Sequence, residues 1–252
     1  MANFSVIIPA AGASSRFGKT HLKKPYALIK NQAVWLYSAQ QFAERKDVGQ
    51  IIIVIAPDDE EYFRMKFNAN IAVMDLTLVI GGKERADSVR NALSRVSAEC
   101  DHVAIHDAAR PCLRENSTDE VFDQAQSSGA AILASPIVGT VKRADPTKPQ
   151  IMETISRERL WQAQTPQAFE KHLLLRAYAD FKGQATDDSQ VVEAYGHPVD
   201  IVQCSTSNLK ITTQEDLRLA ENILKSASRK NIISEFGVAP SKKAGSLDDL
   251  LG

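Results

Sequence analysis

Small and polar residues fill the stretch 9–20, directly after an apolar run at Phe4–Pro9. If that run is a strand, the stretch lies at the carboxyl edge of a sheet, where small residues let backbone N–H groups approach an anion closely. Arg16 and Lys24 add positive charge that could neutralise phosphate oxygens in a transition state. We therefore predict a triphosphate-binding loop, with a tight bend and a solvated basic turn as the plainer alternative.

An aspartate occupies the equivalent place after a second apolar run. Asp107 directly follows His102–His106, so it should emerge at the same edge of the sheet. Mg²⁺ takes one or two protein carboxylates and completes its octahedron with water and substrate phosphates, so one Asp opposite a triphosphate is enough. Capping of the next turn is the ordinary alternative for such an Asp. His102 and His106 have no third ligand in view, so zinc is not expected.

A pair of glycines opens a third stretch at this edge. Gly81–Gly82 precedes a segment of helical periodicity, and adjacent glycines permit a nucleotide base to approach the backbone. Arg85 and Ser88 could reach a sugar or phosphate from the first turn. Capping of the helix by Asp87 or Ser88 is the alternative.

A single lysine lies in an apolar setting late in the chain. We predict a strand at Asn208–Thr212, which would place Lys210 between apolar neighbours. A lysine in such surroundings requires an anionic partner.

Two better-known phosphate motifs fail on spacing. A Walker A loop, G-x-x-x-x-G-K-[ST], has one residue fewer between its glycines than Gly12 and Gly18 enclose. The dinucleotide fingerprint G-x-G-x-x-G is absent. Because Val103–Asp107 resembles an apolar strand that ends in a metal-binding Asp, a P-loop phosphohydrolase stays as the lesser hypothesis.

Short apolar runs alternate with amphipathic stretches along the first two-thirds of the chain. This alternation is typical of βαβ units, so we predict an α/β fold with a mostly parallel sheet and helices on both faces. The predicted strands are Phe4–Pro9, Gln50–Ala56, Leu76–Ile80, His102–His106, Ala130–Pro136 and Val199–Cys204, and the predicted helices are Lys83–Val96, one capped by Asn116–Asp119, Glu170–Phe181, Asp187–Tyr195 and one that begins at Thr213.

The segment Val138–Ile155 breaks this pattern and predicts a protruding β-hairpin arm. Two polar-alternating runs, Thr140–Ala144 and Gln150–Ile155, flank a turn at Pro146–Pro149. An arm that cannot bury a face by itself must lie on something else, and a second copy of the chain is the simplest partner.

Length and composition limit the remaining possibilities. The chain has 252 residues, 44% hydrophobic and 24% charged, and its net charge of −1 supplies no positive field for nucleic acid or an anionic membrane. Three cysteines without a C-x-x-C pair fit a reducing cytoplasm, and no apolar run approaches the ~20 residues that span a bilayer. We expect one domain over residues 1–227 and a loosely attached tail over 228–252.

With these motifs assembled, residues 4–224 resemble the 2-C-methyl-D-erythritol 4-phosphate cytidylyltransferase family. The resemblance rests on motifs that agree in order along the chain. They are Pro9-Ala10-Ala11-Gly12 with Arg16, Lys24 before Tyr26, Gly81-Gly82 with Glu84–Val89, His106–Pro111, Thr165-Pro166-Gln167, Thr186-Asp187-Asp188, and Lys210-Ile211-Thr212 with Glu215-Asp216.

The resemblance implies a Rossmann-like nucleotidyltransferase that joins CMP from CTP to a sugar-alcohol phosphate and releases pyrophosphate, with Mg²⁺ as cofactor. It implies that Arg16 and Lys24 stabilise the pentacoordinate α-phosphate and the departing pyrophosphate, and that Lys210 contacts the α-phosphate. Asp107 would orient Mg²⁺ or the acceptor's hydroxyls. A phosphate nucleophile is already ionised at neutral pH, so no general base is needed. The implied cytidine and triphosphate contacts are Ala10, Ala11, Gly12, Gly82, Ser88 and Ala108.

The resemblance also gives the arm a role, in a homodimer whose arms deliver acceptor contacts to the neighbouring site. Thr140 and Arg157 would bind methylerythritol phosphate in trans, while Arg110 and Thr165 would bind it locally. These assignments explain an arm that lacks apolar partners of its own.

Two departures from the family pattern and two other functions stay open. Pro25 stands where Gln commonly follows the catalytic Lys, and Gly139 where an acidic residue often precedes the Thr. Proline fixes φ and removes an N–H, so it bears on the reach of Lys24.

A ribitol 5-phosphate cytidylyltransferase differs mainly in how the acceptor is held, and the pair Thr140 and Arg157 favours methylerythritol phosphate. A regulator that only binds nucleotide is disfavoured, because it needs no transition-state charges.

Overall fold

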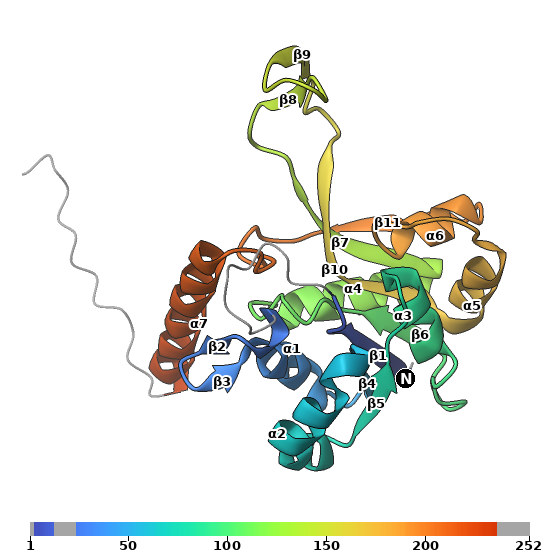
Figure 1. Ribbon diagram of the computed structural model, residues 1–252, viewed down its shortest axis with the longest axis vertical. Coiled ribbons are helices and arrows are strands. Elements are labelled where there is room, and N and C mark those ends of the chain that lie inside the picture. Colours follow the sequence, from blue (N-terminus) through green and yellow to red (C-terminus); the bar gives the residue numbers. More distant parts are fainter. Residues whose placement is uncertain (1–2, 13–23, 236–252) are drawn as a thin grey trace, which may run out of the picture.

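The computed structural model describes residues 3–12 and 24–235, with the backbone alone at Lys24 and 228–235. Within these residues a seven-stranded sheet forms the centre of the molecule (Figure 1). Within this sheet, described neighbouring strands run parallel except where β10 pairs with β6 and β7, which confirms the predicted mostly parallel α/β sheet. In spatial order the strands are β11 (Asp200–Gln203), β7 (Ala130–Pro136), β10 (Trp161–Glu170), β6 (His102–Ile105), β1 (Phe4–Pro9), β4 (Val48–Ile55) and β5 (Leu76–Ile80).

Helices cover both faces of this sheet, as predicted. Successive side chains of a strand point to opposite faces, so Ile53 of β4 belongs to one apolar cluster and Ile52 and Val54 to the other. The first cluster packs against α1 (Val34–Ala43), α2 (Glu60–Val73) and α4 (Glu115–Ser128), and the second against α3 (Arg85–Leu93), α5 (Lys171–Asp180) and α6 (Ser189–Ala194).

The last helix, α7 (Gln214–Glu235), packs outside these two layers. Its Ala220 joins a small cluster with Ile211 and with Ile29 of the hairpin β2 (Leu28–Ile29) and β3 (Gln32–Ala33). The expected domain boundary at residue 227 therefore falls inside α7, because neither Gly nor Pro interrupts the chain before Gly237. The rest of the expected tail, 236–252, lies outside the described residues. Across the described ranges, no helix combines the length and apolarity needed to cross a membrane.

The predicted hairpin arm is present and stands away from the sheet in Figure 1. It consists of β8 (Val141–Ala144) and β9 (Ile151–Ile155), which pair antiparallel between the ends of β7 and β10. Asp145 orders the turn, since its Oδ1 accepts hydrogen bonds from the backbone N–H groups of Thr147 and Lys148 at 2.7 and 3.0 Å. The arm is mostly exposed, as expected of a segment without apolar partners in its own chain.

Two local predictions are wrong, and one strand was missed. Asn208–Thr212 is a loop between β11 and α7 rather than a strand. Asn116–Asp119 lies inside the first turns of α4, whose N-cap residue is Arg114, so these side chains do not cap the helix. Trp161–Glu170, which forms the long strand β10, was not expected to be a strand, because its glutamines and Pro166 conceal the pattern of a buried strand. Two 3₁₀ turns, Lys24–Tyr26 and Pro57–Asp59, complete the described elements.

Candidate active site

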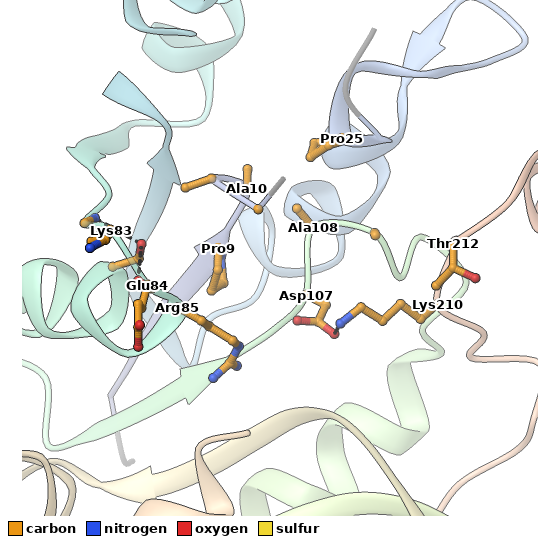
Figure 2. A pocket seen from close by; sticks show the side chains of 15 residues that line it. Pro9, Ala10, Pro25, Lys83, Glu84, Arg85, Asp107, Ala108, Lys210 and Thr212 are labelled. Atoms are coloured by element: carbon orange, nitrogen blue, oxygen red, sulfur yellow. Dashed lines mark hydrogen bonds and ion pairs between the residues drawn. The ribbon is translucent and has the colours of Figure 1, made fainter. Parts of the chain in front are cut away.

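A cavity of about 340 Å³ lies at the carboxyl ends of β1, β5 and β6 (Figure 2). We call it the first cavity. Its position is the edge at which open α/β sheets bind ligands, and its size falls in the range of small-molecule sites. Eight of the predicted site residues line it, namely Ala10, Ala11, Gly12, Gly82, Ser88, Asp107, Ala108 and Lys210.

The side chains of the other two predicted catalytic residues lie outside the part of the chain that the structure describes. Arg16 lies outside the described residues, and so does the side chain of Lys24. Pro25 follows Lys24 in a 3₁₀ turn and lines the first cavity. The departure from the family pattern at Pro25 therefore lies in the wall of the first cavity.

The glycine loop before α3 is closely packed on its own helix. A Cβ at Gly82 would lie 2.3 Å from Cβ of Asp87, so no other residue fits without a shift. The backbone N–H of Gly82 donates to Oγ of Ser88 at 3.1 Å, and that hydroxyl donates to the carbonyl of Glu84 at 3.1 Å. Glu84 and Asp87 form a capping box, so the alternative of capping by Asp87 is confirmed, with Glu84 as an N-cap that was not predicted. Ser88 thus shapes the loop that borders the first cavity.

Asp107 lies between cationic side chains at the floor of the first cavity. Figure 2 shows Lys210 extending to Asp107, with Nζ 2.8 Å from Oδ2. Nε of Arg110 lies 3.5 Å from the same oxygen, and Arg85 approaches from the α3 side. Burial alone would raise the pKa of Asp107, but these cations outweigh it and hold the pKa well below its usual value. Asp107 is therefore a carboxylate at every physiological pH.

These neighbours do not fit the expected role of Asp107 as a metal ligand. A divalent cation beside Asp107 would face the charges of Lys210 and Arg110 at short range. Among the described residues, no three His, Cys, Asp or Glu side chains converge on one point, so a Mg²⁺ ion here would take its other ligands from substrate phosphates and water. The other expected role of Asp107, which is to orient acceptor hydroxyls, does not meet this conflict and stays a prediction.

A second cavity of about 180 Å³ adjoins the first. The two share Arg85, Asp107 and Lys210 in their walls. Arg110 and Thr165, the predicted local acceptor contacts, both line the second cavity. Asp107 and Lys210 thus stand at the junction of the two cavities.

A buried ion pair beside both cavities was not foreseen. Arg85 donates two hydrogen bonds to the carboxylate of Asp188, at 2.9 and 2.5 Å, and Asp188 is fully buried. The hydroxyl of Tyr178 donates to the same carboxylate at 2.5 Å. Burial would lower the pKa of Arg85, but Asp188 outweighs it and raises that pKa. The motif Thr186-Asp187-Asp188 was part of the family resemblance, but the sequence did not identify Asp188 as the partner of Arg85.

Thr140 and Arg157 lie on the arm, just before β8 and just after β9. Both are exposed, and neither lines either cavity. The guanidinium of Arg157 donates to the backbone carbonyl of Val138. Within one protomer the structure therefore does not bring these two residues to Asp107 and Lys210, and their action in trans stays a prediction.

Comparisons of the sequence identify relatives along nearly the whole described chain. A family model described as 2-C-methyl-D-erythritol 4-phosphate cytidylyltransferase matches residues 4–226. The protein of that name from Rhodopirellula baltica is 42% identical over 235 residues, which are 88% of this chain and 95% of the relative. The one from Dictyoglomus thermophilum is 38% identical over 222 residues, 86% of this chain and 95% of the relative.

Solved structures with the same fold agree with the sequence relatives. The 2-C-methyl-D-erythritol 4-phosphate cytidylyltransferase of Thermus thermophilus superimposes with a TM-score of 0.74 at 28% identity, covering 89% of this chain and 100% of that chain. The 4-diphosphocytidyl-2C-methyl-D-erythritol synthase of Anaerococcus prevotii gives a TM-score of 0.74 at 29% identity, over 89% and 96% of the two chains.

Proposed function

The chain belongs to the 2-C-methyl-D-erythritol 4-phosphate cytidylyltransferase family, and we propose that its two adjoining cavities hold the two substrates of that reaction. The enzyme joins CMP from CTP to 2-C-methyl-D-erythritol 4-phosphate and releases pyrophosphate, a step of non-mevalonate isoprenoid precursor synthesis. The first cavity takes CTP and the second takes the acceptor polyol phosphate. The observation that carries this arrangement is that Asp107 and Lys210 border both cavities.

The reaction requires an in-line displacement at the α-phosphorus. An oxygen of the acceptor phosphate forms a new bond to that phosphorus, the bond to the bridging oxygen of the β-phosphate breaks, and pyrophosphate leaves with the electron pair. The acceptor phosphate is ionised at neutral pH, so no side chain has to remove a proton. Catalysis then consists of positioning and of stabilising negative charge as it moves.

Lys210 and Asp107 have different roles at the junction of the two cavities. The ammonium group of Lys210 would contact the α-phosphate, where charge develops in the transition state. The carboxylate of Asp107, which is held by Lys210 and Arg110, would accept hydrogen bonds from acceptor hydroxyls. Arg16 and Lys24 would stabilise the pentacoordinate α-phosphate and the departing pyrophosphate, and the contacts to cytidine and triphosphate would come from the small residues Ala10, Ala11, Gly12, Gly82, Ser88 and Ala108.

Mg²⁺ would enter with the triphosphate of CTP rather than on a protein carboxylate. The cations beside Asp107 support this division, because they leave the phosphates as the better ligands for a hard divalent ion. The residues of this chain would then supply only the surrounding charge.

The remaining parts of the proposal concern the oligomeric state, the cellular location and the macromolecular partners. The enzyme would act as a homodimer in which the arm carries Thr140 and Arg157 to the partner's second cavity, and the exposure of the arm supports this. A cytoplasmic location is supported by Cys100, Cys112 and Cys204, which are free and buried. The net charge of −1 favours neither nucleic acid nor an anionic membrane as partner.

The decisive experiment measures pyrophosphate release with four nucleoside triphosphates and a panel of polyol phosphates. Turnover is expected with CTP and 2-C-methyl-D-erythritol 4-phosphate, and weak turnover with ribitol 5-phosphate. Preference for ribitol 5-phosphate would instead identify the alternative cytidylyltransferase, and failure with every pair would contradict the proposal.

A further inference from the structure

His106 is fully buried next to Asp107, and the reaction described above gives it no role. Its Nε2 lies 3.1 Å from the backbone carbonyl oxygen of Arg110, and its Nδ1 lies 3.1 Å from Oγ1 of Thr165. Phe42 packs edge-on against the imidazole with the ring centroids 5.4 Å apart. The orientation of the ring is therefore fixed by contacts on three sides.

The carbonyl determines which ring nitrogen carries the hydrogen. A carbonyl oxygen only accepts hydrogen bonds, so Nε2 must be protonated and donate to Arg110. The ring is neutral at physiological pH because burial lowers the pKa of His106 to about 4. Nδ1 then keeps its lone pair and accepts the hydroxyl hydrogen of Thr165. The other tautomer would set two lone pairs against each other at Arg110.

The hydroxyl of Thr165 is held from its other side as well. The backbone N–H of Asp107 donates to Oγ1 of Thr165 at 3.0 Å. A hydroxyl has one hydrogen and two lone pairs. The hydrogen goes to His106 and one lone pair goes to Asp107, which leaves one lone pair for a ligand. Thr165 lines the second cavity, so it can accept a hydrogen bond from a bound molecule but cannot donate one.

These contacts belong to a closed circuit of buried residues. Nη1 of Arg110 donates to the carbonyl of Asn208 at 2.7 Å, and Nδ2 of Asn208 donates to the carbonyl of Thr165 at 2.9 Å. The Thr165 hydroxyl donates to His106, which donates to Arg110. The circuit joins the turn after β6, strand β10 and the loop that carries Lys210. Rotating the hydroxyl hydrogen of Thr165 away from His106 would break this circuit.

We propose that His106 is a positioning residue that fixes Thr165 as a hydrogen-bond acceptor, so that Thr165 binds a hydroxyl group of the acceptor substrate rather than its phosphate. The inference rests on the proposed function, because it takes the second cavity to hold a polyol phosphate. Phosphate oxygens offer lone pairs and need donors, which Arg110 and Lys210 can supply. A hydroxyl can donate, and Thr165 therefore contributes to selecting a polyol.

The first test needs no substrate. Long-range ¹H–¹⁵N spectra of the ligand-free protein at neutral pH, with labelled histidine, distinguish a protonated from an unprotonated ring nitrogen, and the signals of His106 are assigned by their loss in His106→Gln. We expect a protonated Nε2 and an unprotonated Nδ1. A protonated Nδ1 would overturn the proposal, and this result would stand whatever reaction the enzyme catalyses.

The second test couples the enzyme and the acceptor. Acceptor analogues in which fluorine replaces one hydroxyl at a time can accept a hydrogen bond but cannot donate one. At the one position whose hydroxyl donates to Thr165, the fluorinated analogue should raise the acceptor KM of the wild type by about tenfold or more. Thr165→Val, which keeps the shape of the side chain, should raise the KM for the natural acceptor to a similar extent without a further increase for that analogue. Thr165→Ser should restore the difference, and additive losses at every position would overturn the proposal.

Two substitutions of His106 provide a matched pair. Asn can place an amide oxygen near the position of Nδ1 and keep an acceptor for Thr165, whereas Gln can place an amide nitrogen near Nε2 and keep only the bond to Arg110. Both lose the ring that packs on Phe42. The acceptor KM should rise more in His106→Gln than in His106→Asn, with CTP affinity alike in the two. Equal acceptor KM values would contradict the role of His106. Absence of turnover with any acceptor would contradict the proposed function instead, and the spectra would still decide the tautomer.

Discussion

Nζ of Lys210 lies 2.8 Å from Oδ2 of Asp107, and this ion pair joins the loop before α7 to the turn after β6. The lysine is about half exposed, with 46% of its side chain accessible, whereas the aspartate is 13% accessible. The carboxylate is therefore the fixed member of the pair and the ammonium group the adjustable one. A lysine held in this way can turn from Asp107 to an incoming phosphate over a short distance.

Removing the charge of Asp107 should uncouple these two side chains. Asp107→Asn keeps the size of the side chain but loses the attraction for Lys210 and Arg110. We expect the acceptor KM to rise and kcat/KM for the acceptor to fall by about 10- to 100-fold, with CTP affinity changed much less. Steady-state kinetics with each substrate varied, together with CTP titration calorimetry, check this. Lys210→Met should lower kcat further, and equal losses in CTP affinity and acceptor kcat/KM for Asp107→Asn would oppose the assignment.

The same substitution has a pH signature in stability. The pKa of Asp107 is lower in the folded protein than its ordinary value of 3.8, mainly because Lys210 and Arg110 outweigh the effect of burial. Its stabilising interactions are thus fully present above that ordinary value and are lost as the pH falls below it. The difference in unfolding free energy between wild type and Asp107→Asn should stay level from pH 7 to about 5 and shrink below about pH 4. Urea titrations at a series of pH values measure it.

His106 should produce a dependence in a different pH window. Its pKa falls from 6.5 to about 4 because the ring is buried, so between these values the unfolded chain binds a proton that the folded protein does not. The free energy of unfolding should therefore decrease as the pH falls from 6.5 to about 4, by at most about 1.4 kcal/mol per pH unit. His106→Gln should lose this slope in urea titrations. An unchanged slope in the variant would show that other groups cause it.

The ion pair between Arg85 and Asp188 should be important for stability. Asp188→Asn leaves the guanidinium of Arg85, whose side chain is 27% exposed, with a neutral partner, and we expect a loss of about 2–3 kcal/mol in unfolding free energy. Tyr178→Phe removes one hydrogen bond to the same carboxylate and should cost about 1 kcal/mol. Chemical denaturation of the two variants tests the ranking. A larger loss in Tyr178→Phe would indicate that packing around the ring matters more than the charge pair.

Gly82 should not tolerate a side chain. A Cβ there would lie 2.3 Å from Cβ of Asp87, so Gly82→Ala must displace the first turn of α3 from the first cavity. We expect CTP affinity to fall by about tenfold or more and unfolding free energy to fall by about 1–3 kcal/mol. Gly183→Ala is the control for stability, because its nearest contact, with the ring of Phe181, is an ordinary 3.4 Å. Similar losses of unfolding free energy in both variants would contradict the steric explanation.

The proposed sharing of sites between protomers can be tested by complementation. Arg157→Ala damages the arm, and Lys210→Ala damages the cavity of the protomer's own fold. If arms act in trans, mixing the two inactive variants should recover about a quarter of wild-type activity, since half of the protomers in statistical mixing are in heterodimers and each heterodimer keeps one intact site. Mass spectrometry confirms subunit exchange. Demonstrated heterodimers without recovered activity would show that each site is built by one chain.

The sequence was most informative where motifs directly follow strands. Gly82 and Asp107 could be placed at one edge, because the carboxyl ends of parallel strands meet there. The need of Lys210 for an anion was also foreseen, and Asp107 supplies it. The local structure around Lys210 was not, since a loop with apolar residues has the same short-range pattern as a strand.

The features that were missed depend on tertiary contacts. Gln164 and Gln167 are buried in β10 because their amides bond to residues far along the chain, among them Asn208 and Asp187. Periodicity cannot reveal such polar burial. The partner of Arg85 was equally hidden, because only the folded chain brings α3 beside α6.

The first cavity takes its walls from Pro9 at one end of the described chain to Thr212 near the other. A polypeptide emerging from the ribosome therefore lacks the part of this wall that Lys210 and Thr212 supply until the loop before α7 has been synthesised. Proteolytic fragments that end before Lys210 would lack the same part of the wall. The first cavity is thus complete only when the loop before α7 has docked, and ligand affinity can report whether that docking has occurred.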